Sequence, residues 1–461
     1  MSRLARLVAL AVCGAATLAF PAIAAAGHEN DPRTDNLLVR GHIFEPAVLG
    51  GFGGANPDIH TDEAFWGKFA FQGNWDGFNI RDIRSANNPR QVSRTFCDGN
   101  QGDVVVWDDI LVRSWNTPAG TPGAFGAGLT CDGEAVAPGF EGLHVFDISN
   151  RDDPVLVAQV PLACGSHTAS AVPDRKNDRL LVYSSSSAHS ATNPNPPATC
   201  DWFDIVEVPF DDPGSAQFLR AEPSMHTCHD IGVILGDVKR AACAGGDGFR
   251  VFSLGGPSGG SLEDPALMHH VTVPTVTVGH SAAFTWDGEV IVFGHEPGGG
   301  VAAECEATDD DLKKSFFFYA TETGAFLGKW TLPRPQSSTE NCTLHNYNLV
   351  PLRNGRDVLV SGNYQAGTWV VDLTDPANAR TVAWSDPPPK PVPPGTPFCC
   401  DVTGAWSTYW YDGLIYETNI GEGLNIFKLK GKETRSAIKL RHLNPQTQEF
   451  SLDDRDDDDD D

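Results

Sequence analysis

Basic residues are scarce in this chain, which has 33 lysines and arginines against 60 aspartates and glutamates and a formal net charge of −27 at pH 7. A surface of this charge repels a phosphate backbone, because nucleic-acid binding depends on cationic side chains. The composition therefore excludes a general nucleic-acid binder. Part of the acidity lies in the terminal run DDDDDD, and we predict that residues 446–461 form an acidic, disordered tail.

Long apolar runs are also missing. After residue 26 no segment approaches the roughly 18 unbroken apolar residues of a membrane-spanning helix, so we expect no transmembrane segment. The first 26 residues contain two arginines, a short apolar core and small residues at the end, which is typical of a secretory signal peptide. We predict cleavage near residues 24–26 and a secreted or cell-surface protein. The alternative is a lipoprotein anchored at Cys13.

Several motifs that would assign an enzyme class are absent as well. The chain has no G-x-S-x-G elbow, no glycine-rich phosphate loop ending in Lys-Ser/Thr, no H-E-x-x-H and no EF-hand ligand series. Its cysteines show no C-x-x-C spacing of a zinc ribbon.

Ten cysteines follow residue 26, and an even number in an exported chain favours disulfides. Their order along the chain predicts local pairs, with the last two cysteines left for a strained bridge between neighbours. The predicted pairs are Cys97 with Cys131, Cys164 with Cys200, Cys228 with Cys243, Cys305 with Cys342, and Cys399 with Cys400.

No long segment shows the 3.6-residue apolar period of a helix, and 33 prolines and 47 glycines interrupt the chain. A repeated strand–turn–strand unit is present instead, as in GLHVFDISNRDDPVLVAQVPL at 142–162. Related units lie at 77–96, 248–273, 367–384 and 423–443. An Asp closes the first strand of three copies (Asp82, Asp147 and Asp372), where its carboxylate can accept a bond from the backbone of the turn.

A second pair of strands precedes each unit, joined by tight turns such as Trp286-Asp287-Gly288. Two pairs make one four-stranded antiparallel blade, and the pattern occurs seven times. We therefore predict an all-β, seven-bladed β-propeller over residues 62–445, preceded by an N-terminal extension at 27–61. Two segments compete to complete the last blade: Leu37-Leu38-Val39 and residues 437–443.

The motif G-[LFT]-x-[VI]-x-D-[ILV]-[ST]-x-x-x-x-P resembles the LVIVD repeat of exported and surface β-propeller proteins of bacteria and archaea. The resemblance covers nearly all of residues 62–443, and three copies keep both the Asp and the Pro. It implies the propeller fold and an extracellular location, but no activity, because that family mostly has none assigned.

Histidines recur at the head of the predicted inner strands. His167, His229 and His280 each lie seven residues before the first hairpin, and His345 holds the same place before a slightly longer one. His60 matches more loosely, seven residues before Gly67. Because the inner strands of a propeller line its channel, these imidazoles are expected to converge at one mouth.

Neutral imidazole suits a transition metal such as iron, copper or zinc. The layout is similar to that of the carotenoid-cleaving oxygenases, seven-bladed proteins with iron on the axis, although no motif of that family is present. Glu296, in a loop expected at the same mouth, is the candidate for orienting an imidazole or relaying a proton. The alternative is that the histidines only fill a polar channel.

Three functions follow from these observations. The first is a binding protein that takes a small molecule, a surface glycan or a protein at the histidine-lined mouth. The second is a metal-dependent oxidoreductase that uses iron or copper, and the third is a structural or adhesive module. We expect a monomer, with Trp75 and Trp115 as candidates for stacking on a sugar or lipid and Trp406 packed between blades.

Overall fold

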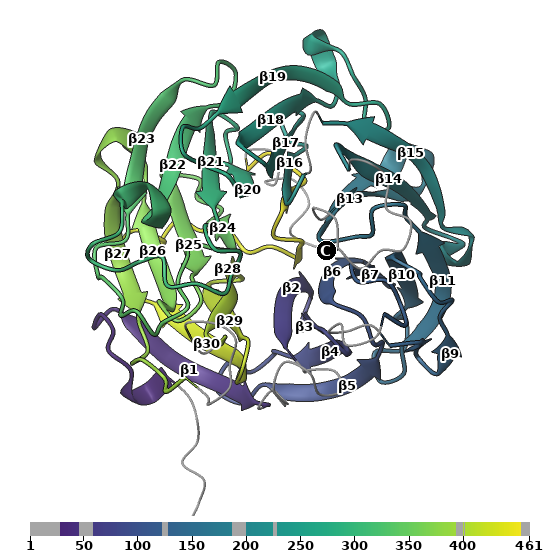
Figure 1. Cartoon of the computed structure of the whole chain (residues 1–461), viewed down its shortest axis with the longest axis horizontal. Coiled ribbons are helices and arrows are strands. Elements are labelled where there is room, and N and C mark those ends of the chain that lie inside the picture. The colour runs from purple at the N-terminus through teal and green to yellow at the C-terminus, as the bar shows by residue number, and fades with distance from the viewer. Residues whose placement is uncertain are drawn as a thin grey trace, which may run out of the picture.

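The computed structural model describes residues 28–45, 59–121, 128–186, 200–224, 228–392, 400 and 402–452. Within these residues the chain forms seven antiparallel four-stranded blades around a central channel, as Figure 1 shows. Two blades carry one additional short strand each from the C-terminal end of the chain. The predicted all-β, seven-bladed β-propeller is confirmed. The predicted signal peptide, 1–26, lies outside the described residues.

The blades are numbered in chain order, and each is given from its inner to its outer strand. Blades 1 and 2 are β2 (His60–Trp66), β3 (Phe69–Asn74), β4 (Gly77–Asp82) and β5 (Arg90–Phe96), then β6 (Gln101–Trp107), β7 (Ile110–Trp115), β10 (Gly142–Asp147) and β11 (Val155–Pro161). Blades 3 and 4 are β12 (Ala169–Asp174), β13 (Arg179–Ser185), β14 (Trp202–Pro209) and β15 (Gln217–Pro223), then β16 (Ile231–Ile234), β17 (Arg240–Gly245), β18 (Gly248–Ser253) and β19 (Ala266–Thr272).

Blades 5 and 6 are β20 (Gly279–Phe284), β21 (Val290–His295), β22 (Ser315–Ala320) and β23 (Phe326–Thr331), then β24 (Tyr347–Leu349), β25 (Val358–Gly362), β26 (Thr368–Asp372) and β27 (Arg380–Ser385). Blade 7 is β28 (Ala405–Tyr411), β29 (Leu414–Asn419), β30 (Gly423–Leu429) and β1 (Leu37–Phe44). Four short strands remain: β8 (Thr130–Cys131), β9 (Glu134–Ala135), β31 (His442–Leu443) and β32 (Thr447–Gln448).

Helix is confined to single turns in the described residues. The 3-10 helices are η1 (His28–Asn30), η2 (Arg175–Asn177), η3 (Pro213–Ser215), η4 (Gly256–Ser258), η5 (Asp311–Lys314) and η6 (Pro376–Asn378). In this described part, no helix has the length and apolar character needed to cross a membrane.

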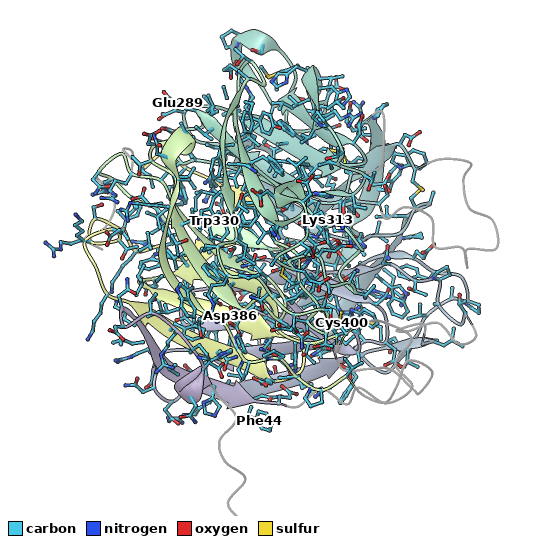
Figure 2. The ribbon with its side chains drawn as sticks, turned by 60° about the vertical axis from the view of Figure 1, so that its left-hand side comes forward. Phe44, Glu289, Lys313, Trp330, Asp386 and Cys400 are labelled. Carbon is cyan, nitrogen blue, oxygen red and sulfur yellow. A yellow bond between two sulfur atoms is a disulfide. The ribbon has the colours of Figure 1, made fainter. Side chains whose placement is uncertain are left out.

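The blades are held together by the apolar faces of neighbouring sheets. A central strand such as β17 is buried along its whole length, because another blade covers each face of its sheet. Between blades 5 and 6, Trp330, which is labelled in Figure 2, packs against Trp369 with ring centroids 5.7 Å apart. Burial of such aromatic rings between sheets supplies much of the driving force for stacking the blades.

The aspartates that close the repeats make the predicted turn bonds. Oδ1 of Asp82 accepts from the backbone N–H of Arg84 at 3.0 Å, Oδ1 of Asp147 from Ser149 at 2.8 Å, and Oδ1 of Asp372 from Thr374 at 3.1 Å. These bonds support the bend between the third and fourth strands of blades 1, 2 and 6.

Four of the five predicted disulfides are confirmed. They join Cys97 to Cys131, Cys164 to Cys200, Cys228 to Cys243, and Cys305 to Cys342. Cys400 is disulfide-bonded, and its predicted partner Cys399 lies outside the described residues. Because such bonds persist in oxidising compartments, they indicate an extracellular protein.

The ring is closed by the N-terminal strand. β1 pairs antiparallel with β30, in a register from Leu37 opposite Leu429 to Phe44 opposite Gly423. Of the two segments that competed to complete blade 7, the structure therefore uses the N-terminal one. Residues 37–44 of the predicted N-terminal extension are thus part of blade 7, where they cover the free edge of β30.

The C-terminal residues 442–452, here called the C-terminal segment, cross the channel at the end opposite the histidines. β31 pairs with the end of β2, and β32 pairs in parallel with the end of β16. Gln448 donates to the carbonyl of Phe284 at 2.8 Å. The expectation of a tail starting at residue 446 is therefore corrected: 446–452 belong to the fold, because inner strand ends offer unpaired backbone groups. Residues 453–461 lie outside the described residues.

Asn444 fixes this segment to blade 2 and gives a first test. Its Oδ1 accepts from the N–H of Val106 at 2.8 Å and its Nδ2 donates to the carbonyl of Val106 at 2.9 Å, all in a buried site. Asn444→Ala leaves both backbone groups unpaired, and we expect it to lower the free energy of unfolding by about 3 kcal/mol, measured by urea denaturation. Asn88→Ala, which removes an exposed amide in blade 1, is the comparison and is expected to change the free energy of unfolding by less than about 0.5 kcal/mol. A loss below about 1 kcal/mol for Asn444→Ala would contradict the role assigned to Asn444.

Candidate functional site

The channel contains a cavity of about 250 Å³ at the end where the inner strands begin. All seven blades contribute to it through residues at or near the start of their inner strands, and the loops between the second and third strands of blades 1, 5 and 6 add Trp75, Glu296 and Tyr364. The lining residues that carry polar or aromatic groups are Thr61, Asp62, Trp75, Asn100, Gln101, Asp103, His167, Thr168, His229, Asp230, His280, Glu296, His345, Asn346, Tyr364 and Trp406.

Four of the five predicted histidines lie side by side in this cavity, on blades 3 to 6. The ring centroids are 4.2 Å apart for His167 and His229, 4.1 Å for His229 and His280, and 4.4 Å for His280 and His345. Residues more than 170 positions apart in the sequence, from His167 to His345, thus form one continuous arc. The structure places them as the shared strand-head position predicts.

His280 is aimed into the channel by a β-bulge. In blade 5 the register runs from Gly279 opposite His295 directly to Ser281 opposite Gly294, so His280 has no partner on the neighbouring strand. Bulges of this kind redirect one side chain and are common next to functional sites.

His60 is set apart from the other four histidines. Its Nε2 lies 3.0 Å from the main-chain carbonyl of Glu45, and it does not line the cavity. The reason is a bulge in blade 1, where Thr61 and Asp62 together oppose one residue of β3 and take the channel-facing place. His60 is therefore removed from the candidate ligands.

Two carboxylates contact the histidine arc. Oδ1 of Asp230 lies 3.1 Å from Nδ1 of His229, and its Oδ2 lies 3.8 Å from Nδ1 of His280. Glu296 lies on the other side, with Oε2 3.9 Å from Nε2 of His280 and Oε1 3.5 Å from Nε2 of His345. The predicted position of Glu296 beside the histidines is thus the observed one, whereas Asp230 was not singled out from the sequence.

Glu296 is held by a further contact. The hydroxyl of Tyr364 donates to its Oε1 at 2.6 Å, and this tyrosine stacks near His345 with ring centroids 4.4 Å apart. The other ring nitrogen of His345, Nδ1, bonds the main-chain carbonyl of Trp406. Such contacts fix the orientation of an imidazole and leave its Nε2 directed toward Glu296.

Burial keeps the imidazoles neutral. It lowers the pKa of His229 to about 4 and that of His345 to about 3, and it holds the pKa values of His167 and His280 well below their usual range. Burial raises the pKa of Glu296 to about 7, against the hydrogen bond from Tyr364. Unprotonated imidazole nitrogens are the form that binds metal ions.

A second group of carboxylates lies deeper in the channel. Asp62 accepts from the hydroxyl of Tyr409 and, at 2.8 Å, from Nε2 of Gln446 in the C-terminal segment. Oδ2 of Asp103 accepts from the N–H of Ala169 at 2.6 Å. Burial raises the pKa of Asp62 to about 6 and that of Asp230 to about 7. These aspartates follow the strand heads by one or two positions. That spacing is the sequence signal from which their place in the channel could have been predicted.

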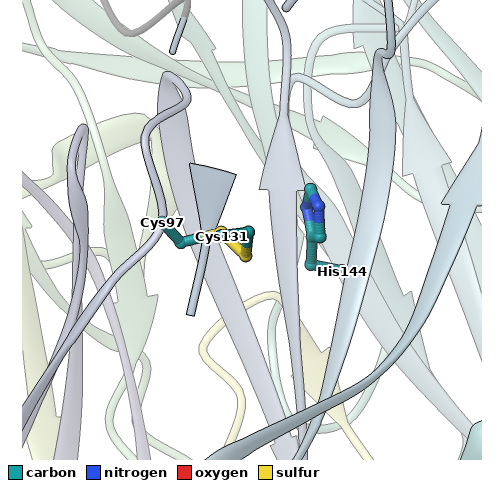
Figure 3. A group of neighbouring side chains, drawn as sticks. All are labelled: Cys97, Cys131 and His144. Carbon is teal, nitrogen blue, oxygen red and sulfur yellow. A yellow bond between two sulfur atoms is a disulfide. The ribbon is translucent and has the colours of Figure 1, made fainter. Parts of the chain in front are cut away.

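A separate group of potential ligands consists of Cys97, Cys131 and His144 (Figure 3). The two sulfur atoms are joined in a disulfide, so neither is a thiolate that can bind a metal ion. Burial and the neighbouring Arg113 lower the pKa of His144 to about 3. This group is therefore a structural part of blade 2.

Part of the cavity wall, on blades 1, 6 and 7, is apolar and aromatic. Trp75 and Trp406 are half-buried there and pack with Ile59 and Tyr364. Trp75 was predicted as a stacking residue, and it does line the cavity, whereas Trp406 was expected to pack between blades. The rings of Trp406 and His345 are arranged edge to face, with centroids 5.2 Å apart.

In comparisons with known proteins, no family model and no curated protein matches this chain. The functional conclusions below therefore depend on the geometry of the site, and the resemblance of the repeat to the LVIVD family stays a prediction.

Proposed function

We propose that this extracellular β-propeller binds a divalent transition metal ion at the mouth of its channel. One observation carries the proposal: a ligand atom from each of His229, His280 and Glu296 lies within 4.8 Å of the other two. The three come from β-strand heads and a loop of blades 4 and 5, which the propeller holds rigidly. His345 and His167, at the two ends of the arc, supply further nitrogen donors beside them.

The donor set favours particular metals. Two imidazoles and one carboxylate are the ligands of many iron(II) sites and of zinc sites, and copper(II) also prefers imidazole nitrogen. Calcium and magnesium prefer sites built entirely from oxygen atoms, which this is not. The contact between Asp230 and His229 is of the kind that orients a ligating imidazole from outside. We infer that iron, copper or zinc is the natural occupant.

The same proposal extends to cellular location and family. The four confirmed disulfides support a compartment outside the cytoplasm, and the first 26 residues support export by a signal peptide. The closing Asp and Pro of three blades support membership of the LVIVD-repeat proteins. We place the mature protein at the cell surface or in the medium.

A metal-dependent oxidoreductase is the second candidate. It is favoured by the cavity of about 250 Å³ that borders the three ligands, because a catalytic metal needs an open position for its substrate. In such an enzyme the bound iron or copper would supply the electron transfer, while Tyr364 holds the ligand Glu296 in place.

Elemental analysis tests the metal proposal. The chain is exported with its own leader, purified without an affinity tag, and measured for iron, copper and zinc before and after equilibration with each ion. We expect close to one ion per chain. A protein that neither retains nor takes up any of the three would contradict the proposal, and binding to glycans or cell envelopes by the metal-free chain would then favour an adhesive module.

A further inference from the structure

The cavity has two chemically different walls. On blades 3 to 6 the histidine arc, Asp230 and Glu296 present nitrogen and oxygen atoms. On blades 6, 7 and 1 lies a set that we call the apolar wall, made of Ile59, Trp75, Tyr364, Val402 and Trp406. Blades 7 and 1 stand across the ring from blade 4, so a molecule in the cavity touches both walls at once. A cavity with these two walls fits a ligand that has one apolar and one polar side.

The size of the cavity limits the ligand. A cavity of about 150 Å³ in another protein holds benzene, and typical ligand pockets start at about 300 Å³. A cavity of about 250 Å³ therefore accommodates one ring with a short substituent. The C-terminal segment crosses the opposite end of the channel, where it pairs with β2 and β16, so a long chain has no passage along the axis.

The charges around the cavity disfavour anions and cations in different forms of the site. Among the described residues that line it there is no lysine or arginine, whereas Asp62, Asp103, Asp230 and Glu296 are all present. In the metal-free form an anion would meet these carboxyl groups without a cationic partner, and in the metal-loaded form a cation would be repelled by the bound ion. The polar atoms that remain, on Asn100, Gln101 and Asn346, donate and accept hydrogen bonds as a hydroxyl group requires.

We propose that the cavity binds an uncharged, one-ring aromatic alcohol or phenol, with its ring on Trp75 and Trp406 and its hydroxyl toward Glu296 and the metal ligands. The assignment of the hydroxyl rests on the proposed metal site, while the assignment of the ring depends only on the apolar wall. Tryptophan faces attract aromatic rings by stacking and by burial of apolar area. Trp406 lies beside His345 in an edge-to-face arrangement and joins the two walls, so a ring held against this tryptophan lies next to the histidine arc.

The test uses three one-ring probes of nearly equal size: benzyl alcohol, benzoate and benzylammonium. Their affinities are measured by calorimetry in the metal-free and the metal-loaded protein. We expect benzyl alcohol to bind at least tenfold more tightly than benzoate in the metal-free form, and at least tenfold more tightly than benzylammonium in the metal-loaded form. Equal or tighter binding of benzoate without metal, or of benzylammonium with metal, would overturn the proposed ligand class.

Substitutions in the apolar wall locate the ring. Trp406→Ala is expected to weaken binding of benzyl alcohol at least tenfold and Trp406→Phe by less than about threefold, since phenylalanine keeps an aromatic face. Phe326→Ala, at an exposed phenylalanine of β23, is the control for an aromatic residue outside the cavity. Thermal unfolding shows that each variant is folded. Unchanged binding of benzyl alcohol in Trp406→Ala would contradict the assignment of the ring to the apolar wall.

The two proposals fail separately. Metal content is measured for every variant beside probe affinity. If the protein holds no metal but still binds benzyl alcohol through Trp406, the proposed metal site is wrong and the apolar wall is supported. If it holds one metal ion but binds none of the three probes, the metal site is supported and the proposed ligand class is wrong.

Discussion

Replacing His280 by alanine is expected to weaken the binding of zinc, copper or iron at least a hundredfold. His280 is the central member of the arc, with ring centroids 4.1 Å from His229 and 4.4 Å from His345, and its Nε2 lies 3.9 Å from Glu296. Its removal takes away one of three close ligands and separates the other two. The affinity is measured by competition with a coloured chelator, and circular dichroism shows whether the variant is folded.

A graded series sharpens this prediction. Asp230 contacts His229 but is not one of the three proposed metal ligands, and Asp230→Asn removes its carboxylate. Loss of such an outer carboxylate typically costs 10- to 100-fold in metal affinity. His60→Gln is the matched control, because His60 heads an inner strand yet contacts Glu45 outside the cavity. If His60→Gln weakened metal binding as much as His280→Ala, it would be wrong to use the bulges of blades 5 and 1 to include His280 among the ligands and to remove His60.

The largest expected effect on stability comes from Glu417, which is fully buried in β29. Its Oε1 accepts from Nε2 of His28 at 2.8 Å, and its Oε2 accepts from the hydroxyl of Thr368 at 2.7 Å. Glu417→Ala leaves a buried imidazolium without this partner, and removal of one member of a buried ion pair costs about 3–5 kcal/mol. We expect a loss of this size in the free energy of unfolding, measured in urea with the disulfides intact.

The double variant His28→Leu/Glu417→Leu is the comparison. Replacing both members of a buried pair by apolar residues is often neutral or stabilising, because no uncompensated charge is left. We expect it to recover most of the stability that Glu417→Ala loses. A double variant as unstable as the single one would show that the hydrogen bonds from Thr368 and Asn425, and not the ion pair, carry the effect.

The pair also predicts a pH dependence. Burial acts to lower the pKa of His28, but the carboxylates of Glu417 and Asp31 outweigh it and raise the pKa to about 10. Burial likewise opposes the charge of Glu417, but His28 and the hydrogen bonds lower its pKa to about 2. The contribution of His28 is therefore complete below its ordinary pKa of 6.5 and is lost as pH rises toward 10. That of Glu417 is complete above 4.5 and is lost as pH falls toward 2.

These signs give a measurable difference between two proteins. The stability advantage of the natural chain over His28→Gln should be greatest between about pH 4.5 and 6.5, and it should shrink by on the order of 3 kcal/mol by pH 10. Urea unfolding at pH 5.5, 8 and 10 checks it. An advantage that stayed constant over this range would mean that His28 is neutral in the folded protein.

Local sequence determined the blade and most of the site. A strand, its closing Asp and the turn after it lie within a few residues of one another, so the bonds of Asp82, Asp147 and Asp372 depend only on neighbours in the chain. The shared spacing before the first hairpin placed His167, His229, His280 and His345 together, because equal positions in a ring of equal blades meet at one point. The four confirmed disulfides likewise join cysteines next to one another in the order of the chain.

Tertiary structure alone decided what depends on competition between distant segments. β1 and not residues 437–443 fills the edge of β30, since the register with Leu429 and Phe427 exists only once the ring has closed. The bulge of Thr61 and Asp62 turns His60 away and brings a carboxylate into the channel in its place. Trp406 lines the cavity for the same reason: the register of blade 7 passes from Ala405 directly to Ser407, so Trp406 has no partner on β29.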